Sequence, residues 1–141
     1  MDAEIARNVA HYSHAGQRTR FDEQFAEHVE RVAARVEPEA RSLAYLHDVL
    51  ERTATPLSEL WDAGLTPTEA EALDLLTRWP GESFEAHTLR VAHAHGSAGD
   101  LARAVKLADL DDHLAHPQMP PGAPAYAWAR HHITHGQQLA A

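Results

Sequence analysis

Three polar side chains, His28, His47 and Asp109, stand among apolar neighbours at helical spacing, and Asp48 follows directly after His47. A buried carboxylate must be paired or bind a cation, although a single histidine on an apolar face is more often a hydrogen-bonded core residue. Together the four side chains offer two imidazole nitrogens and two carboxylate oxygens from three predicted helices. This donor set suits Mn, Fe, Zn, Co or Ni, and Mg less well, and it leaves coordination positions for water and substrate.

The helix predicted over residues 38–52 is expected to form one wall of a polar pocket. His47 continues its apolar face, and Asp48 lies about 100° further round the helix. Glu51 and Arg52 follow Asp48 by three and four positions, so the three side chains form a polar strip beside the buried face.

The hydrophobic periodicity is helical throughout, and no alternating strand pattern of useful length is present. A strong start signal lies at Thr66-Pro67-Thr68-Glu69, which combines a cap, a proline at the first position and a glutamate three residues after the cap. We predict an all-α fold, a helical orthogonal bundle of about seven or eight helices in a single domain over residues 1–141. The predicted helices span 3–15, 24–36, 38–52, 55–61, 66–79, 83–95, 98–116 and 125–139.

The composition indicates a globular protein, with 44% hydrophobic and 23% charged residues. There are no cysteines, so a metal must be bound by His, Asp or Glu. The formal net charge of −9 argues against binding of a nucleic acid polymer. A small phosphorylated substrate is compatible with this charge, because a metal reverses the local field. No apolar run approaches the ~18 residues of a membrane span, and a cytoplasmic location is expected.

The order His, then His-Asp, then Asp on an all-α chain resembles the HD-domain metal-dependent phosphohydrolases. The likeness is strongest to the (p)ppGpp hydrolase domain of RelA/SpoT proteins and to their small stand-alone homologues, and it covers most of the chain. Residues 14–17, His-Ala-Gly-Gln, followed by His28, resemble the opening motif of that family. Residues 46–53 resemble its central His-Asp-x-x-Glu-Asp-Thr motif, residues 76–78 a Val-Thr-Lys stretch, and residues 106–109 match Lys-Leu-Ala-Asp.

The resemblance implies that His28, His47, Asp48 and Asp109 bind one divalent metal ion, with Mn²⁺ as the first choice and Zn, Fe, Co, Ni or Mg as alternatives. It further implies a phosphohydrolase that acts on a nucleotide or nucleotide-like phosphate, with (p)ppGpp as the special case. In such an enzyme a metal-bound hydroxide attacks phosphorus, and the acid at Glu51 orients the water or takes its proton.

Arg52 departs from the family pattern, in which a second acid follows the glutamate. Three interpretations stay open: an ion pair with Asp48, a phosphate contact in the cleft, or an exposed surface side chain. Arg52 is therefore a catalytic candidate together with Glu51, and it puts hydrolysis of (p)ppGpp in doubt.

The residues expected to contact substrate lie in the loop over 17–23 and around Asp109. The loop keeps one of two basic positions of the family, at Arg20, and has another arginine at 18. Positions about one turn from Asp109 can line the same pocket. The candidate substrate-binding residues are Arg18, Arg20, Lys106, Asp112 and His113.

Two alternatives to a phosphohydrolase remain. A catalytically weakened HD module would bind a metal and a nucleotide without turnover, which the charge reversal at Arg52 favours. A metal-dependent oxygenase would require further histidine ligands, and the sequence does not place them. The oligomeric state is unknown at this stage.

Overall fold

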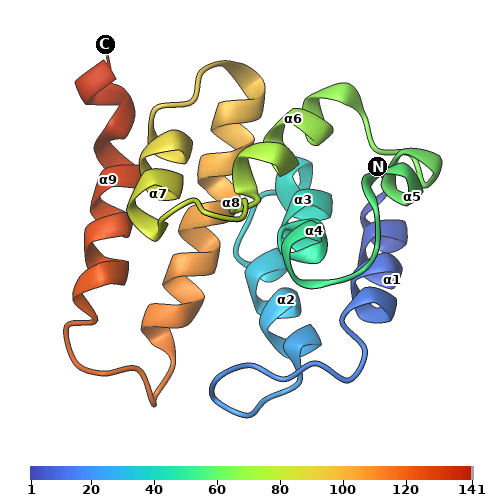
Figure 1. Ribbon diagram of the computed structural model, residues 1–141, viewed down its shortest axis with the longest axis horizontal. Helices are drawn as coiled ribbons and strands as arrows, with labels where there is room; N and C mark the ends of the chain where they lie inside the picture. Colours follow the sequence, from blue (N-terminus) through green and yellow to red (C-terminus); the bar gives the residue numbers. More distant parts are fainter. Residues whose placement is uncertain (141) are drawn as a thin grey trace.

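The computed structural model describes residues 1–140, with side chains through residue 136, and consists of helices joined by loops (Figure 1). The elements are α1 (Ala3–Ser13), α2 (Phe25–Ala34), the 3-10 helix η1 (Pro38–Ala40), α3 (Arg41–Leu46), α4 (Val49–Arg52), α5 (Leu57–Asp62), α6 (Pro67–Leu76), α7 (Phe84–Ala92), α8 (Gly96–Ala115) and α9 (Pro124–Ala140). Within these residues no β-strand occurs, and Arg18 and Gln24 form an isolated antiparallel bridge. The predicted all-α class is confirmed.

Seven of the eight predicted helices are present as single helices, with ends that differ by up to a few residues. The signal at Thr66 behaves as predicted. The Thr66 hydroxyl accepts the Glu69 amide, the Glu69 carboxylate accepts the Thr66 amide, and Pro67 opens the helix. This reciprocal cap satisfies amides that the first helical turn would leave unpaired.

The helix predicted over 38–52 is broken at His47 and Asp48, and this is the main departure from expectation. η1 and α3 precede the break, and α4 follows it. His47 Nδ1 donates to the Ala44 carbonyl at 2.6 Å, which is the carbonyl that the Asp48 amide would use in a continuous helix. Asp48 adopts φ −107° and ψ 0°, outside helical values. The break therefore rotates Asp48 away from the direction that a regular helix would give it.

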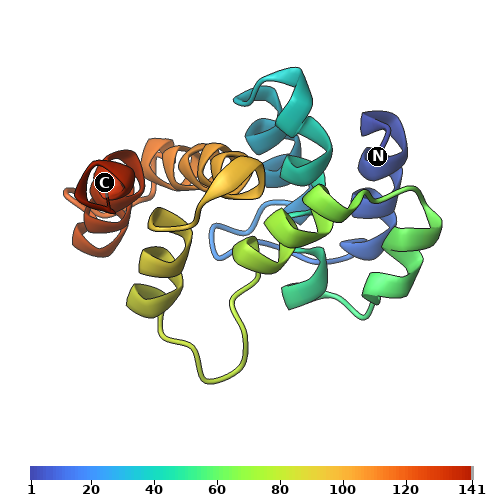
Figure 2. The ribbon, with the colours of Figure 1, turned by 90° about the horizontal axis from the view of Figure 1, so that it is seen from above.

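The longest helix in the described part of the chain, α8 with 20 residues, connects the two parts of the bundle. It packs against α7 and α9 on one side and against α2 and α6 on the other, while α1 packs against α3. The view from above shows α7 and α9 at one end and α1 with α5 at the other (Figure 2). Residues of α2, α3 and α8 therefore meet near the middle of the molecule.

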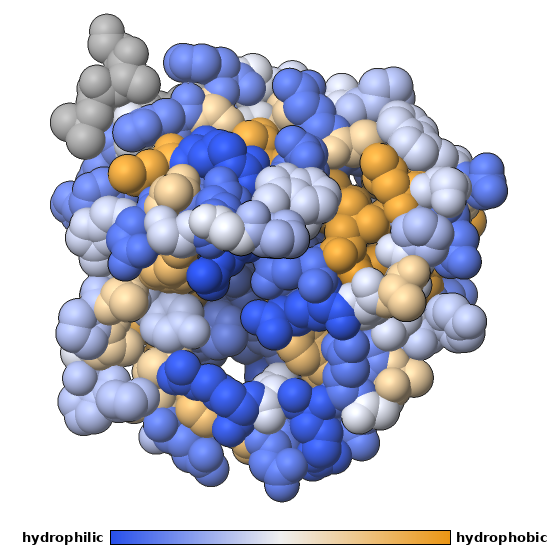
Figure 3. Space-filling view, in the orientation of Figure 1, coloured by the Kyte–Doolittle hydropathy of each residue, from blue (hydrophilic) through white to orange (hydrophobic). Residues whose placement is uncertain are grey.

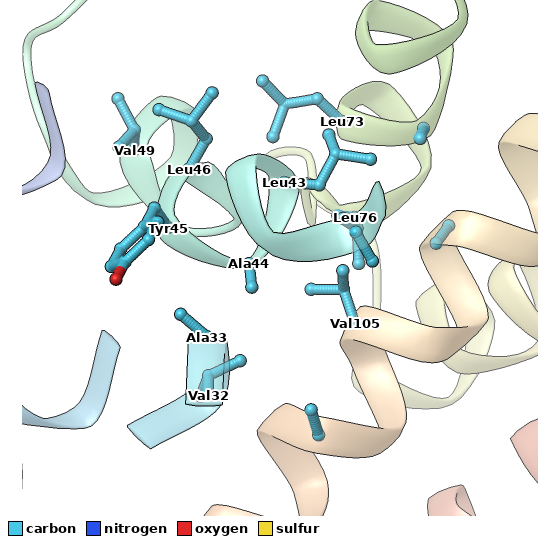
Figure 4. Packing of buried hydrophobic residues seen from close by; sticks show 14 of the residues in the cluster. Val32, Ala33, Leu43, Ala44, Tyr45, Leu46, Val49, Leu73, Leu76 and Val105 are labelled. Carbon is cyan, nitrogen blue, oxygen red and sulfur yellow. The ribbon is translucent and has the colours of Figure 1, made fainter. Parts of the chain in front are cut away.

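The hydrophobic core lies directly behind this meeting point. Leu43, Leu46, Leu73 and Val105 are each fully buried and interlock between α3, α6 and α8 (Figure 4). Burial of one such side chain contributes about 1.5–3 kcal/mol. Because Leu46 directly precedes His47, the core fixes the position of the backbone that carries the polar residues.

Among residues 1–140, no helix is both long enough and apolar enough to cross a membrane.

Candidate metal centre

Four side chains from three parts of the bundle converge on one point. His28 comes from α2, His47 and Asp48 from the break between α3 and α4, and Asp109 from α8. One coordinating atom of each lies within 4.8 Å of those of the others. Both imidazoles and Asp109 are buried, and Asp48 is partly buried. The structure thus brings together all four residues predicted as metal ligands, and this buried group can hold a metal ion.

The atoms that face one another in this group lack hydrogen bonds. His28 Nε2 lies 3.0 Å from Asp109 Oδ1, and His47 Nε2 lies 3.0 Å from Asp48 Oδ2 and 3.4 Å from Asp109 Oδ1. These contacts are close but misaligned, so both Nε2 atoms and Asp109 Oδ1 have no hydrogen-bond partner among the described residues. Buried polar atoms without partners are costly, and a cation between them would satisfy all three.

The second nitrogen of each imidazole fixes the orientation of its ring. His28 Nδ1 contacts Asp112 Oδ2 at 2.8 Å, and His47 Nδ1 contacts the Ala44 carbonyl at 2.6 Å. An ionised carboxylate and a carbonyl only accept, so Nδ1 carries the proton in both rings. In the neutral imidazole, Nε2 then presents a lone pair to the centre, as a metal-binding histidine does.

The charges in the centre stabilise one another strongly. Burial lowers the pKa of His28, but the carboxylates of Asp109 and Asp112 outweigh it and raise the pKa to about 9. Burial also opposes charge on His47, yet Asp48 and Asp109 hold its pKa well above the usual range. Burial disfavours the ionised carboxylates of Asp48 and Asp109, but the neighbouring imidazoles hold their pKa values low. A divalent cation would take over the role of the imidazole protons, so its binding would release them.

Two cavities open on the centre. The first, of about 200 Å³, is lined by the 18–21 segment and reaches His28, Asp48 and Asp112. The second, of about 120 Å³, reaches His47, Asp48 and Asp109 and extends towards α7. Residues that line both are Asp48, Arg52, His113 and Tyr126. Figure 3 shows hydrophilic residues around a hollow between α2 and α8 on the face seen there.

Glu51 and Arg52 lie at the edge of the centre, on α4, after the break that separates them from the regular helix expected to carry the polar strip. Glu51 Oε1 accepts the Arg78 backbone amide at 2.9 Å, and its Oε2 lies 3.8 Å from Arg52 Nη2. Arg52 Nε lies 3.7 Å from Asp48 Oδ1, and its guanidinium carbon lies 5.7 Å from the centroid of the Phe25 ring. Arg52 therefore lies beside the predicted ligand Asp48 without a hydrogen bond to it, and it lines both cavities.

Arg18 and Arg20 both line the first cavity, as expected of residues that contact substrate. Arg18 Nε donates to Asp22 Oδ1 at 2.7 Å, which holds the side chain along its own loop. The Arg20 guanidinium carbon lies 4.7 Å from the centroid of the Phe21 ring and 5.6 Å from that of Tyr126. The first cavity thus has planar groups of both kinds, guanidinium and aromatic.

Lys106 and His113 flank the predicted ligand Asp109. Lys106 Nζ lies 3.6 Å from Asp109 Oδ2, and His113 Nε2 lies 3.3 Å from Asp109 Oδ1. His113 also stacks on Tyr126, with ring centroids 5.1 Å apart. Both residues line the second cavity, so each can contact a bound molecule as well as the ligand.

Asp112 lines the first cavity, as its substrate-binding prediction requires, but its oxygens contact neighbouring side chains. Its side chain is only 5% exposed, one oxygen contacts His28, and the other accepts from Arg31 Nε at 2.7 Å. Arg31 is in turn held by Glu23 at 2.7 Å. Both its oxygens have partners, so its contacts hold the imidazole of the predicted ligand His28.

Several residues near the centre were not predicted as site residues from the sequence. Arg31 lies one turn after His28, and this spacing was an available signal. Tyr126 and His116 reach the first cavity only because α8 and α9 pack together, and His116 stacks on Phe21 with ring centroids 3.8 Å apart. His87 lines the second cavity, and its one signal is its place on the apolar face of its helix.

Comparison of the sequence with models of known protein families gave no match, and comparison with curated proteins gave none either.

Proposed function

We propose that this protein is a metal-dependent phosphohydrolase that acts on a nucleotide or nucleotide-like phosphate. The observation that carries the proposal is the convergence of two buried imidazole Nε2 atoms and Asp109 Oδ1, all without hydrogen bonds, where two cavities meet. This donor set fits Mn²⁺, and Zn, Fe, Co, Ni or Mg are the alternatives to be tested. A divalent ion held there lowers the pKa of a bound water and polarises a phosphoryl oxygen.

The charges around the centre favour an anionic substrate. A divalent ion would balance the two ligand carboxylates, and the second cavity would then present Lys106, Arg52 and Arg78 against the single acid Glu51. The local field would be positive although the chain carries a formal charge of −9. Guanidinium and ammonium groups bind phosphate well, which supports a phosphate ester as the substrate class.

Glu51 is positioned to handle a proton. Because Oε1 accepts the Arg78 amide, the carboxylate is fixed in orientation, and Oε2 is the oxygen that can orient a water. Arg52, at 3.8 Å from that oxygen, would neutralise a phosphoryl oxygen on the cavity side.

The first cavity suits a planar organic group. Arg20 lies over Phe21 and near Tyr126, and Phe21 stacks on His116. Aromatic rings and guanidinium planes stack on all nucleobases, whichever base is present. This arrangement supports a nucleotide, and (p)ppGpp remains the special case to be tested.

The proposal is tested by phosphate release from a nucleotide panel that includes ppGpp, with purified protein and each candidate metal. His47→Ala removes a ligand, and His93→Ala, an exposed histidine at the end of α7, is the matched control. We expect release by the wild type and the control but not by His47→Ala. Release of intact pyrophosphate from ppGpp would identify the alarmone activity. No release with any metal would overturn the proposal.

One observation favours a second function, a module that binds metal and nucleotide without turnover. Glu51 already has the Arg78 amide on one oxygen and Arg52 near the other, so both of its oxygens face partners other than a water. Nucleotide binding without phosphate release from any member of the panel would select this alternative.

A further inference from the structure

His87 is a buried histidine outside the predicted site. It lies on α7, is only 2% exposed and lines the second cavity together with Lys106. It is not one of the four residues whose coordinating atoms cluster. Burial of a polar ring costs free energy unless its nitrogens form hydrogen bonds, so the partners of both ring nitrogens matter.

The partner of Nδ1 determines what this ring can offer to the cavity. Arg90 Nη2 lies 3.4 Å from His87 Nδ1, beside the shorter bonds that the same nitrogen donates to Glu82 Oε1 and the Thr77 carbonyl, and Glu82 Oε1 lies 3.7 Å from His87 Nδ1. A guanidinium can only donate. Because Arg90 is the nearer of the two groups and cannot accept, it favours the neutral ring with the proton on Nε2. Arg90 is itself held by both oxygens of Glu82, at 2.8 and 2.9 Å, and by the Thr77 carbonyl at 2.9 Å.

This arrangement is opposite to that of the predicted metal ligands. In His28 and His47, Nδ1 faces an acceptor, so Nε2 has the lone pair that a metal requires. In His87, Nδ1 faces a donor, so Nε2 has an N–H. His87 is thus built as a hydrogen-bond donor, and no acceptor for Nε2 occurs among the side chains and backbone through residue 136.

The charges around His87 keep the ring neutral. Burial, followed by the charges of Lys106 and Arg90, lowers the pKa of His87 to about 4. At neutral pH the ring therefore donates from Nε2 without a charge of its own. The Lys106 ammonium supplies the charge, and its only ion pair in the described chain is with Asp109, at 3.6 Å.

We propose that His87 and Lys106 form an anion subsite in the second cavity that binds the phosphoryl end of the substrate. The first cavity then takes the organic part, since it is the larger, at about 200 against 120 Å³, and has the aromatic rings. The substrate is therefore a phosphomonoester or pyrophosphate ester that lies across the centre. Its organic part is in the first cavity, and its phosphoryl end is in the second. This inference rests on the proposed function for the identity of its ligand.

Binding of orthophosphate to the metal-loaded protein, measured by calorimetry, tests the subsite directly. His87→Phe keeps a ring but removes the donor, and Lys106→Met keeps the stem but removes the charge. Loss of a hydrogen bond to a charged group weakens binding roughly 10- to 100-fold, and we expect that loss in each variant. His93→Phe, on the exposed end of the same helix, should bind orthophosphate as the wild type does.

His87→Gln separates a binding role from a packing role, because its amide can replace the Nε2 donor. We expect it to recover most of the affinity that His87→Phe loses, with metal stoichiometry unchanged in both. Equal orthophosphate affinity in the wild type, His87→Phe and Lys106→Met would overturn the subsite, and so would absence of binding to the wild type. If His87→Phe fails to fold, Lys106→Met and His87→Gln decide by the same comparison.

The outcomes also separate the subsite from the proposed function. Orthophosphate binding that depends on His87, without hydrolysis of any nucleotide, would support the subsite and contradict the enzyme activity. Hydrolysis of nucleotides with orthophosphate binding unaffected by His87→Phe would support the activity and contradict the subsite.

Discussion

Replacement of Asp112 by asparagine should weaken metal binding although Asp112 is not a ligand. Its carboxylate contacts His28 Nδ1 at 2.8 Å and is 5% exposed, so little water can replace it. Asparagine keeps the shape but loses the charge that holds the Nδ1 proton and increases the basicity of Nε2. Loss of such a partner costs about 10- to 100-fold in metal affinity, which corresponds to roughly 1.4–2.8 kcal/mol. Arg31 would keep Glu23 as its other partner.

The assay is competition for Mn²⁺ or Zn²⁺ with a chromophoric chelator. Asp111→Asn is the matched control, because Asp111 is the neighbouring residue of α8 and pairs at the surface with Arg130 at 2.6 Å. We expect weaker metal binding in Asp112→Asn and wild-type binding in Asp111→Asn. If Asp112 instead contacts substrate, as predicted from the sequence, Asp112→Asn would raise KM while metal affinity stays constant. That result would refute the role assigned to Asp112 from its contacts.

Three further predictions concern stability. Gly99→Ala should destabilise the fold by about 1–3 kcal/mol, because its Cβ would lie 2.5 Å from the Ala94 carbonyl oxygen; thermal unfolding measures this, and an unchanged Tm contradicts the packing. The pKa of His87 is lowered to about 4 by burial, Lys106 and Arg90. Protons therefore bind the unfolded state preferentially between pH 6.5 and 4, so stability falls as pH falls through this window, by up to about 3 kcal/mol. Denaturant unfolding of His87→Gln should show a smaller fall than the wild type, and equal slopes would contradict the buried neutral ring. Mn²⁺ at about 100 times its Kd should raise Tm by roughly 5–10 °C, and persistence of the increase after a chelator is added would count against specific binding.

The helices could be predicted because local signals agree with the final packing. Thr66 and Glu69 form the cap that their spacing predicts, and the period of apolar residues gives the class of the fold. The break at His47 was not predictable from periodicity. It depends on the His47 side chain taking the Ala44 carbonyl, a choice that tertiary placement of the ring decides.

The predicted ligands could be found from sequence because each occupies a polar position against an apolar face or follows one directly. The residues that determine which imidazole nitrogen carries the proton could not be predicted from the sequence in this way. Asp112 and His113 are adjacent in sequence and were assigned the same role, yet Asp112 supports His28 while His113 lines both cavities. His87 resembles any core histidine until the position of Arg90 shows which nitrogen accepts. Such distinctions depend on which helices pack together, which one sequence does not reveal.

The central claim is that the His28, His47, Asp48 and Asp109 group binds the ion on which hydrolysis depends. The most direct measurement is phosphate release from the nucleotide panel by protein stripped with a chelator, before and after one equivalent of Mn²⁺ is added. We predict no release from the stripped protein and recovery with one equivalent per chain. Release that is independent of metal, or none with any candidate metal, would contradict the claim.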